Sequence, residues 1–295
     1  MPSWRRILTA LSLLAIIGCG SGDRLPGAGA SLRPALEKAA AMWARFPVDA
    51  NPRPIVMAGR LKADSVTAFP DGDSKVAFLA GQFDLKGKLP AAPEQYHGYP
   101  VITAEAAFDQ LRQPSAKGAS TTHRLDVTHA RLGLATFTTD RGLRELPAWL
   151  FDLITVHGYV AVLAVAPSAV YQSAEQGYDS RAADISDDGT TLSVRFTGSG
   201  VGTGPCTSTY ELATYESPQA VAVSVIEHRN GVGPSASPSD KRVVCNLVGY
   251  GRHAETTLTQ PLGNRVVVYD TGAVLSVGRC AGKAGRTDPS CTTVD

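Results

Sequence analysis

Residues 191–196 read Thr-Leu-Ser-Val-Arg-Phe, and residues 221–225 read Val-Ala-Val-Ser-Val. In both stretches a large apolar side chain recurs at every second position. Successive side chains of a β-strand point to opposite faces, so this period of two predicts strands with one buried face. A turn at Asp187-Asp188-Gly189 leads into the first stretch. The two stretches therefore predict a sheet in the C-terminal part of the chain.

The neighbouring segments extend this predicted sheet. Residues 230–240 are rich in Gly, Pro and Ser and predict a long loop between strands. Residues 172–184 are polar and are expected to link the two halves of the chain. Further strands are predicted at 209–215, 247–259 and 266–269. About five strands of this kind are typical of an antiparallel, sandwich-like β region.

The N-terminal half mixes helices and strands. Apolar residues at three- and four-residue spacings predict a helix over Ser31–Phe46, ending before Pro47. Thr103 is placed to cap a second helix ending near Arg112. The turn at 71–74 is expected to lead into a strand at Val76–Ala80. The apolar face of the first helix consists of Leu36, Ala39, Ala40, Trp43 and Phe46, and a three-stranded meander is predicted at 131–138, 148–156 and 159–166.

These patterns predict an α+β, β-rich fold. A mixed α/β region spans residues 36–172, and a C-terminal antiparallel β-sandwich-like region spans residues 173–295. A hydrophobic content of 43% excludes a disordered chain, because it is enough to bury a core.

The N-terminus has the features of a secretory signal peptide. Arg5 and Arg6 form a positive segment, and an apolar run follows from Ile7 to Ile17. This run is shorter than the roughly 20 apolar residues that cross a bilayer. Residues 1–18 are therefore predicted to be removed on export.

The end of this segment, Ile16-Ile17-Gly18-Cys19, resembles the bacterial lipobox. The resemblance implies cleavage between Gly18 and Cys19 and attachment of lipid to the Cys19 thiol. Each acyl methylene buried in the bilayer contributes about 0.8 kcal/mol, so the lipid would hold the chain at the extracytoplasmic face of the cell membrane. Residues 19–35, which are Gly-rich at first, are expected to form a flexible tether. A plain signal peptide with a chance cysteine, or an uncleaved anchor, is the alternative.

The cysteine count supports export. Of the five cysteines, four remain once Cys19 is assigned to the lipid, and an even number in an exported chain predicts disulfides. The sequence-local pairing, Cys206–Cys245 and Cys280–Cys291, is preferred among the three possible pairings. No pair of cysteines has the short spacing of a structural zinc site.

The charge balance argues against nucleic acid as a partner. The formal net charge is +1. Removal of residues 1–18 takes away two arginines and no acid, which changes the net charge to −1. Nucleic-acid binding requires a clustered basic surface, which this balance does not indicate.

Two motifs resemble functional sites but lack the features that such sites require. The Gly-rich stretch 198–204 lacks the Lys-Ser/Thr ending and the following helix of a phosphate-binding loop. His123, Asp126 and His129 have a metal-like spacing, but on a strand the two histidines would lie about 20 Å apart. No catalytic residue, cofactor or metal ligand is therefore nominated.

Several stretches resemble uncharacterised lipoproteins of high-GC actinobacteria. The resemblance implies an exported, membrane-tethered protein and supplies no active-site residues. The first hypothesis is a non-catalytic envelope lipoprotein that binds an envelope protein or a cell-wall partner. An extracellular or cell-wall hydrolase and a small-ligand or lipid carrier are the alternatives. The similar stretches are the segment ending at Cys19, residues 45–56, Thr139–Gly142 with Leu146–Trp149, Gly204–Cys206, and residues 245–269.

Overall fold

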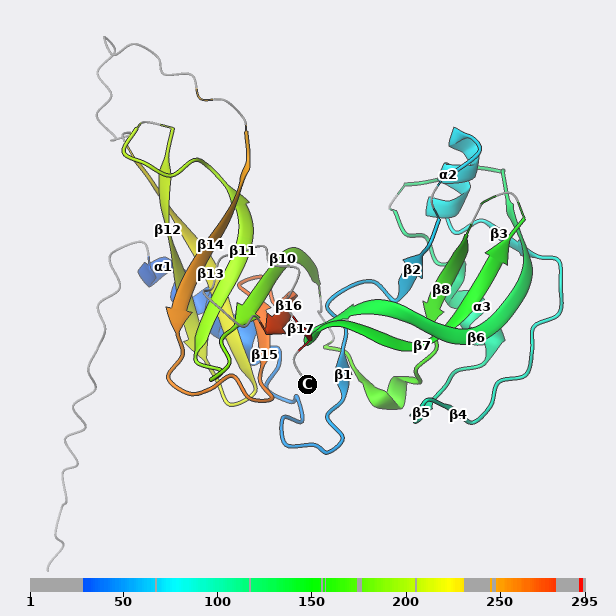
Figure 1. Cartoon of the computed structure of the whole chain (residues 1–295), viewed down its shortest axis with the longest axis horizontal. Coiled ribbons are helices and arrows are strands. Elements are labelled where there is room, and N and C mark those ends of the chain that lie inside the picture. The colour runs from blue at the N-terminus through cyan, green and yellow to red at the C-terminus, as the bar shows by residue number, and fades with distance from the viewer. Residues whose placement is uncertain are drawn as a thin grey trace, which may run out of the picture.

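The computed structural model describes residues 29–66, 68–116, 118–154, 156, 158–173, 177–204, 206–230, 245, 248–279 and 292–293. Among the residues that the structure describes, strands make up 46% and helices 13%, which confirms the α+β, β-rich class. An N-terminal α/β part and a C-terminal sheet lie at opposite ends of the long axis (Figure 1).

The N-terminal elements are α1 (Gly29–Ala41), β1 (Ile55–Val56), β2 (Lys62–Asp64), α2 (Gly72–Leu79), β3 (Phe83–Leu85), β4 (Gln95–Tyr96), β5 (Tyr99–Pro100), α3 (Ala104–Leu111), β6 (Leu125–Thr139), β7 (Gly142–Leu153), β8 (Tyr159–Leu163), a 3-10 turn (Pro167–Ala169) and β9 (Val170–Tyr171). The C-terminal elements are β10 (Tyr178–Ile185), β11 (Thr191–Gly198), β12 (Ser208–Glu216), β13 (Ala220–Arg229), β14 (Tyr250–Thr257), β15 (Val266–Tyr269), β16 (Val274–Arg279) and β17 (Thr292–Thr293).

The N-terminal sheet has the strand order β2-β8-β7-β6-β3. Strands β6, β7 and β8 pair antiparallel in sequence order, which confirms the predicted meander. Helices α2 and α3 contribute to the apolar cluster on one face of this sheet. The helix predicted after Thr103 is also confirmed, because the Thr103 hydroxyl accepts a hydrogen bond from the Ala106 N–H at 3.2 Å.

The strand predicted at Val76–Ala80 is wrong, because these residues belong largely to helix α2. The Asp71 side chain accepts a hydrogen bond from the Ser74 N–H at 2.7 Å and caps the helix. A short apolar run does not by itself distinguish a strand from a buried helix. Here the capping residue decides between them.

The C-terminal strands form one strongly curved sheet in the order β12-β13-β15-β16-β10-β11-β14, with β17 paired to β16. Its two end strands, β12 and β14, lie next to each other, so the sheet is nearly closed (Figure 1). Two pairs, β13 with β15 and β10 with β16, are parallel, and the other pairs are antiparallel. Part of the polar segment predicted as a link, residues 178–184, is instead strand β10 between β16 and β11.

The two faces of strand β13 explain how helix α1 is placed. Val221 and Val223 face the interior of the curved sheet, while Ala220 and Ala222 face outward against α1. Small outward side chains let the helix approach the strands closely. Trp43, fully buried, packs there with the predicted apolar face of the helix. Helix α1 thus packs on the C-terminal sheet, although it precedes the N-terminal sheet in the chain.

A buried turn joins the two parts. The turn 139–142 connects β6 to β7, and its Asp140 and Arg141 are only 2% and 5% exposed. The Asp140 carboxylate forms ion pairs with both Arg53 and Arg141. The backbone carbonyl of Asp140 accepts a hydrogen bond from the Val277 N–H of β16. Arg141 donates to the Gly263 carbonyl at 2.7 Å. Burial lowers the pKa of Arg141 to about 10, an effect that the Asp140 charge opposes.

Candidate functional site

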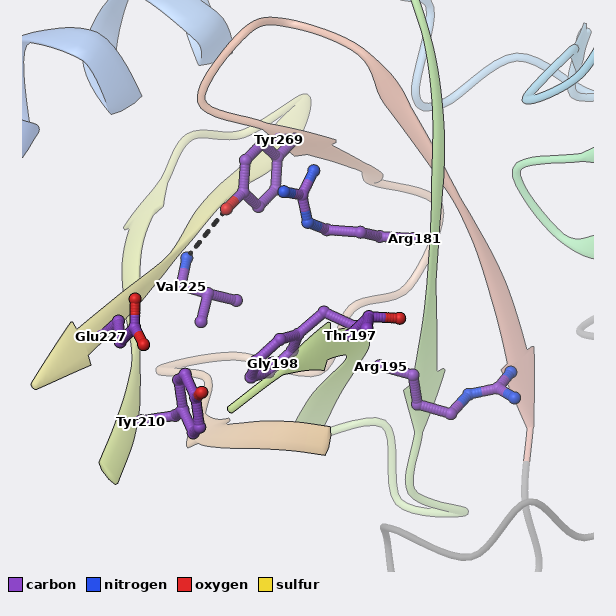
Figure 2. Close-up of a pocket in the computed structure, with 9 residues that line it drawn as sticks. Arg181, Arg195, Thr197, Gly198, Tyr210, Val225, Glu227 and Tyr269 are labelled. Carbon is purple, nitrogen blue, oxygen red and sulfur yellow. Dashed lines mark hydrogen bonds between the residues drawn. The ribbon is translucent and has the colours of Figure 1, made fainter. Parts of the chain in front are cut away.

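A pocket of about 390 Å³ opens at one end of the curved C-terminal sheet, where β11 and β13 end and β12 begins. Figure 2 shows the side chains that surround it. They come from β10, β11, β12, β13 and β15, and they are Arg181, Arg195, Phe196, Thr197, Gly198, Tyr210, Val225, Glu227 and Tyr269.

Strand periodicity explains why polar groups line this end. Along β13, Val221 and Val223 fill the apolar interior, and Val225 and Glu227 continue in the same phase toward the opening. Along β10, Arg181 continues the inward phase of Ala183 and Ile185. The interior therefore changes from apolar to polar as the pocket is reached.

Arg181 and Tyr269 form one side of the pocket. The Arg181 guanidinium lies 4.1 Å from the centroid of the Tyr269 ring and donates to Asp179 Oδ2 at 2.7 Å. The Tyr269 hydroxyl accepts a hydrogen bond from the Val225 N–H at 3.3 Å. Strand β15 ends at Tyr269, which pairs with Val223 of β13. Strand β15 therefore has no backbone carbonyl beside Val225, and the Tyr269 hydroxyl accepts the Val225 N–H instead.

On the other side of the pocket, the Glu227 carboxylate accepts the last hydrogen bond in a chain of hydroxyl groups. The Ser199 hydroxyl donates to Ser208 Oγ at 2.7 Å, and the Ser208 hydroxyl donates to Glu227 Oε1 at 2.8 Å. The Tyr210 hydroxyl lies 2.9 Å from Ser199 Oγ and accepts the Ser199 N–H at 2.6 Å. The other carboxylate oxygen, Glu227 Oε2, lies 3.6 Å from the guanidinium of Arg229.

The Gly-rich stretch 198–204 borders the pocket and connects β11 to β12. At Gly198 a Cβ atom would lie 2.5 Å from the Tyr210 hydroxyl, so the close approach of this ring requires glycine. The carbonyl of Ser199 accepts a hydrogen bond from Arg252, and the carbonyl of Gly202 accepts one from Asn230. The carbonyl groups of the stretch thus bond to β14 and to the residue that follows β13, as expected for a connection between strands.

Arg195 reaches the pocket only at its margin. Its side chain points away from the other labelled residues in Figure 2 and pairs with Asp184 on the outer face of the sheet at 2.8 Å. Asp184 is 5% exposed, and burial raises its pKa, while the charge of Arg195 opposes this shift.

The sequence-predicted site residues occupy the following places in the structure. Cys206 and Cys245 form a disulfide with a Cα–Cα distance of 5.5 Å. Gly18, Cys19, Cys280 and Cys291 lie outside the described residues. His123 contacts Ser74, and Asp126 pairs with Lys86 at 3.3 Å. Within the described ranges, no cluster of three or more His, Cys, Asp or Glu side chains is arranged to hold a metal, and no helix has the length and apolarity to cross a membrane.

The sequence pattern does not predict the pocket, because its residues are spread over five strands. One signal was present in the sequence. Glu227 occupies the inward phase that Val221, Val223 and Val225 establish, so a carboxylate interrupts an otherwise apolar face. A charged residue in the buried phase of a strand is a reason to expect a partner or a site.

Comparisons of the chain with protein-family models, with curated proteins and with solved structures gave no match.

Proposed function

We propose that the chain is an exported lipoprotein, anchored at the extracytoplasmic face of the cell membrane, whose ectodomain binds a ligand without catalysing a reaction. The anchor rests on Arg5, Arg6, the apolar run 7–17 and the Gly18-Cys19 pair. The Cys206–Cys245 disulfide is compatible with an oxidising compartment.

The pocket at the end of the C-terminal sheet is the binding site in this proposal. The observation that supports this assignment is the pairing of the charged side chains that line the pocket. Each ionised residue that lines the pocket has a partner of opposite charge within the protein: Asp179 for Arg181, Asp184 for Arg195, and Arg229 for Glu227. Preorganised polar groups around an apolar floor are typical of a ligand site.

The anchor is tested by replacing Cys19 with Ser and fractionating cells. The variant should lose acyl mass and leave the membrane fraction, whereas Ser21→Ala, a change two residues after the same cysteine, should stay membrane-bound. A Cys19→Ser protein that remains in the membrane fraction would refute lipid anchoring.

Binding at the pocket is tested by photocrosslinking in cells. Val201, on the β11–β12 connection three residues after the pocket-lining Gly198, is 65% exposed, and Ile154, just after β7 of the N-terminal sheet, is 58% exposed. A diazirine-bearing residue in place of Val201 should form a discrete crosslinked adduct with the ligand. The same residue in place of Ile154 should form no such adduct. Equal labelling at both positions, or none at either, would contradict a binding site here.

A second candidate function, an extracellular hydrolase, is favoured by the hydroxyl chain. Ser199, Ser208 and Glu227 follow one another in the order of a nucleophile, a relay and a base. However, the Ser199 N–H is used by Tyr210, so it is not free to stabilise an oxyanion. A fluorophosphonate probe that labels the wild-type protein and not Ser199→Ala would favour the hydrolase over the binding protein.

A further inference from the structure

We infer that the pocket at the end of the C-terminal sheet binds a neutral, hydroxyl-rich ring, namely one or two sugar residues of a glycan. This inference rests on the proposed function and adds the chemical class of the ligand. It is argued from the donors, the acceptor, the apolar surface and the charge balance of the pocket.

The donors lie on the side of Arg181 and Tyr269. The oxygen of the Tyr269 hydroxyl accepts the Val225 N–H, and the hydroxyl proton, which no described residue accepts, is available to a ligand. Tyr269 is 92% buried, since its exposed fraction is 8%, so this donor is held in place by packing. Arg181 uses one nitrogen for Asp179 and keeps further N–H groups for a ligand.

The acceptor lies on the opposite side. Glu227 Oε1 receives the Ser208 hydroxyl, which fixes the orientation of the carboxylate. Glu227 Oε2 accepts no hydrogen bond from the described residues, and its ion-pair partner Arg229 is 3.6 Å away with a side chain that is 74% exposed. In Figure 2 the Glu227 carboxylate and the Arg181 guanidinium lie on opposite sides of the hydrogen bond between Tyr269 and Val225.

Apolar side chains also line the pocket. Val225 and the ring of Phe196 line the pocket, and Phe196 packs edge-to-face against Tyr210 with centroids 4.9 Å apart. A sugar ring has hydroxyl groups around its edge and C–H groups on its faces. It can therefore bond to donors and an acceptor at its edge while its face contacts Val225 and Phe196.

The charge balance separates a sugar from an amino acid. A zwitterion would also match a guanidinium and a carboxylate on opposite sides. However, Arg181 and Glu227 are each paired within the protein, by Asp179 and Arg229. A charged ligand would compete with these ion pairs. The hydroxyl groups of a sugar can instead bond to the Arg181 N–H groups and the Glu227 oxygen that the ion pairs leave free. The neutral ligand is therefore the better match.

The test is isothermal titration calorimetry of the full-length protein in detergent. The probes are cellobiose and maltose as free sugars, neutral polysaccharide purified from the envelope of the producing cells, and L-alanine as the zwitterion. Binding of a neutral sugar without binding of L-alanine is expected. Binding of the polysaccharide but not of the free disaccharides would identify the envelope glycan as the source, and the reverse would identify a free sugar.

Two conservative variants address the donors and the acceptor. Tyr269→Phe removes one hydroxyl and Glu227→Gln removes one charge, and each should weaken sugar binding about tenfold or more, as for a lost hydrogen bond to a ligand. Tyr159→Phe, on β8 of the N-terminal sheet, and Glu211→Gln, which faces His228 on the outer side of β12, are the matched controls and should bind as the wild type does.

The outcomes separate this inference from the proposed function. If Val201 is crosslinked specifically but neither the sugars nor the polysaccharide bind, the sugar inference fails and the binding function stands. Binding of L-alanine alone would also overturn it. If sugars bind and both variants retain full affinity while folded by circular dichroism, the ligand lies elsewhere and the assignment to this pocket is wrong.

Discussion

Replacing Asp140 with Asn should destabilise the protein by about 3–5 kcal/mol, which is typical when one partner of a buried ion pair is removed. The Asp140 side chain is 2% exposed, that of Arg141 is 6% exposed and that of Arg53 is 16% exposed. Without the carboxylate, two neighbouring guanidinium groups would remain buried with no opposing charge from residue 140.

The magnitude follows from the geometry. The Arg53 Nη1–Asp140 Oδ1 distance is 3.3 Å, and the Arg141 Nε–Asp140 Oδ2 distance is 3.7 Å. At an effective dielectric constant of about 20, one such attraction is worth about 5 kcal/mol before the cost of desolvation is subtracted. The Asn side chain keeps a hydrogen-bonding oxygen, so the loss reports mainly the missing charge.

The assay is urea unfolding of the full-length protein, followed by far-ultraviolet circular dichroism. The control is Asp126→Asn, because Asp126 pairs with Lys86 at 3.3 Å and both side chains are well exposed. An exposed pair contributes about 0–1 kcal/mol, so the control should unfold at nearly the wild-type urea concentration. A loss at Asp140 no larger than that of the control would refute the argument that this turn holds the two parts together.

Three further perturbations follow from the structure. Gly198→Ala places a Cβ atom 2.5 Å from the Tyr210 hydroxyl and should cost about 1–3 kcal/mol in urea unfolding, whereas Gly204→Ala, with no atom within 4 Å, should stay near the wild type. Cys206→Ser opens a bridge that spans 39 residues and should cost about 2–4 kcal/mol in urea unfolding, and a reductant should destabilise the wild type more than the variant, which already lacks this bridge. Burial raises the pKa of Asp184 above 3.8, so this group lowers wild-type stability as the pH rises through the folded pKa. The difference in unfolding free energy between Asp184→Asn and the wild type should therefore shift in favour of the variant as the pH rises above the ordinary carboxyl pKa of 3.8, and a difference that does not change with pH would contradict this.

Local sequence signals were sufficient where one element carried its own pattern. The meander β6-β7-β8 was predictable because its strands are consecutive and separated by turns. Helix α1 was predictable from the spacing of its apolar residues, although it ends at Ala41 and not at Phe46. From Trp43 to Phe46 the backbone hydrogen bonds span three residues, a tighter turn than the α-helix has, as the chain approaches Pro47.

Local signals failed where tertiary packing or one capping contact decided the structure. Residues 76–79 are apolar enough for a strand, but the Asp71 cap begins a helix. Residues 178–184 are polar enough for a linker, yet they form β10 between two partners. The polar side chains of β10 are accommodated by pairing, as Arg181 with Asp179 and Asp184 with Arg195.

The sequence by itself determined the β-rich class, the inward phase of β11 and β13, and the prediction of export and lipidation at Cys19. These features depend on residues that are close together in the chain. Only the tertiary structure decided that the C-terminal sheet curves until β12 meets β14, and that helix α1 covers its outer face. It also brought Arg181, Tyr210, Glu227 and Tyr269 around one pocket. The physical reason is that the pairing of distant strands sets which inward side chains meet, and a local pattern shows only that each faces inward.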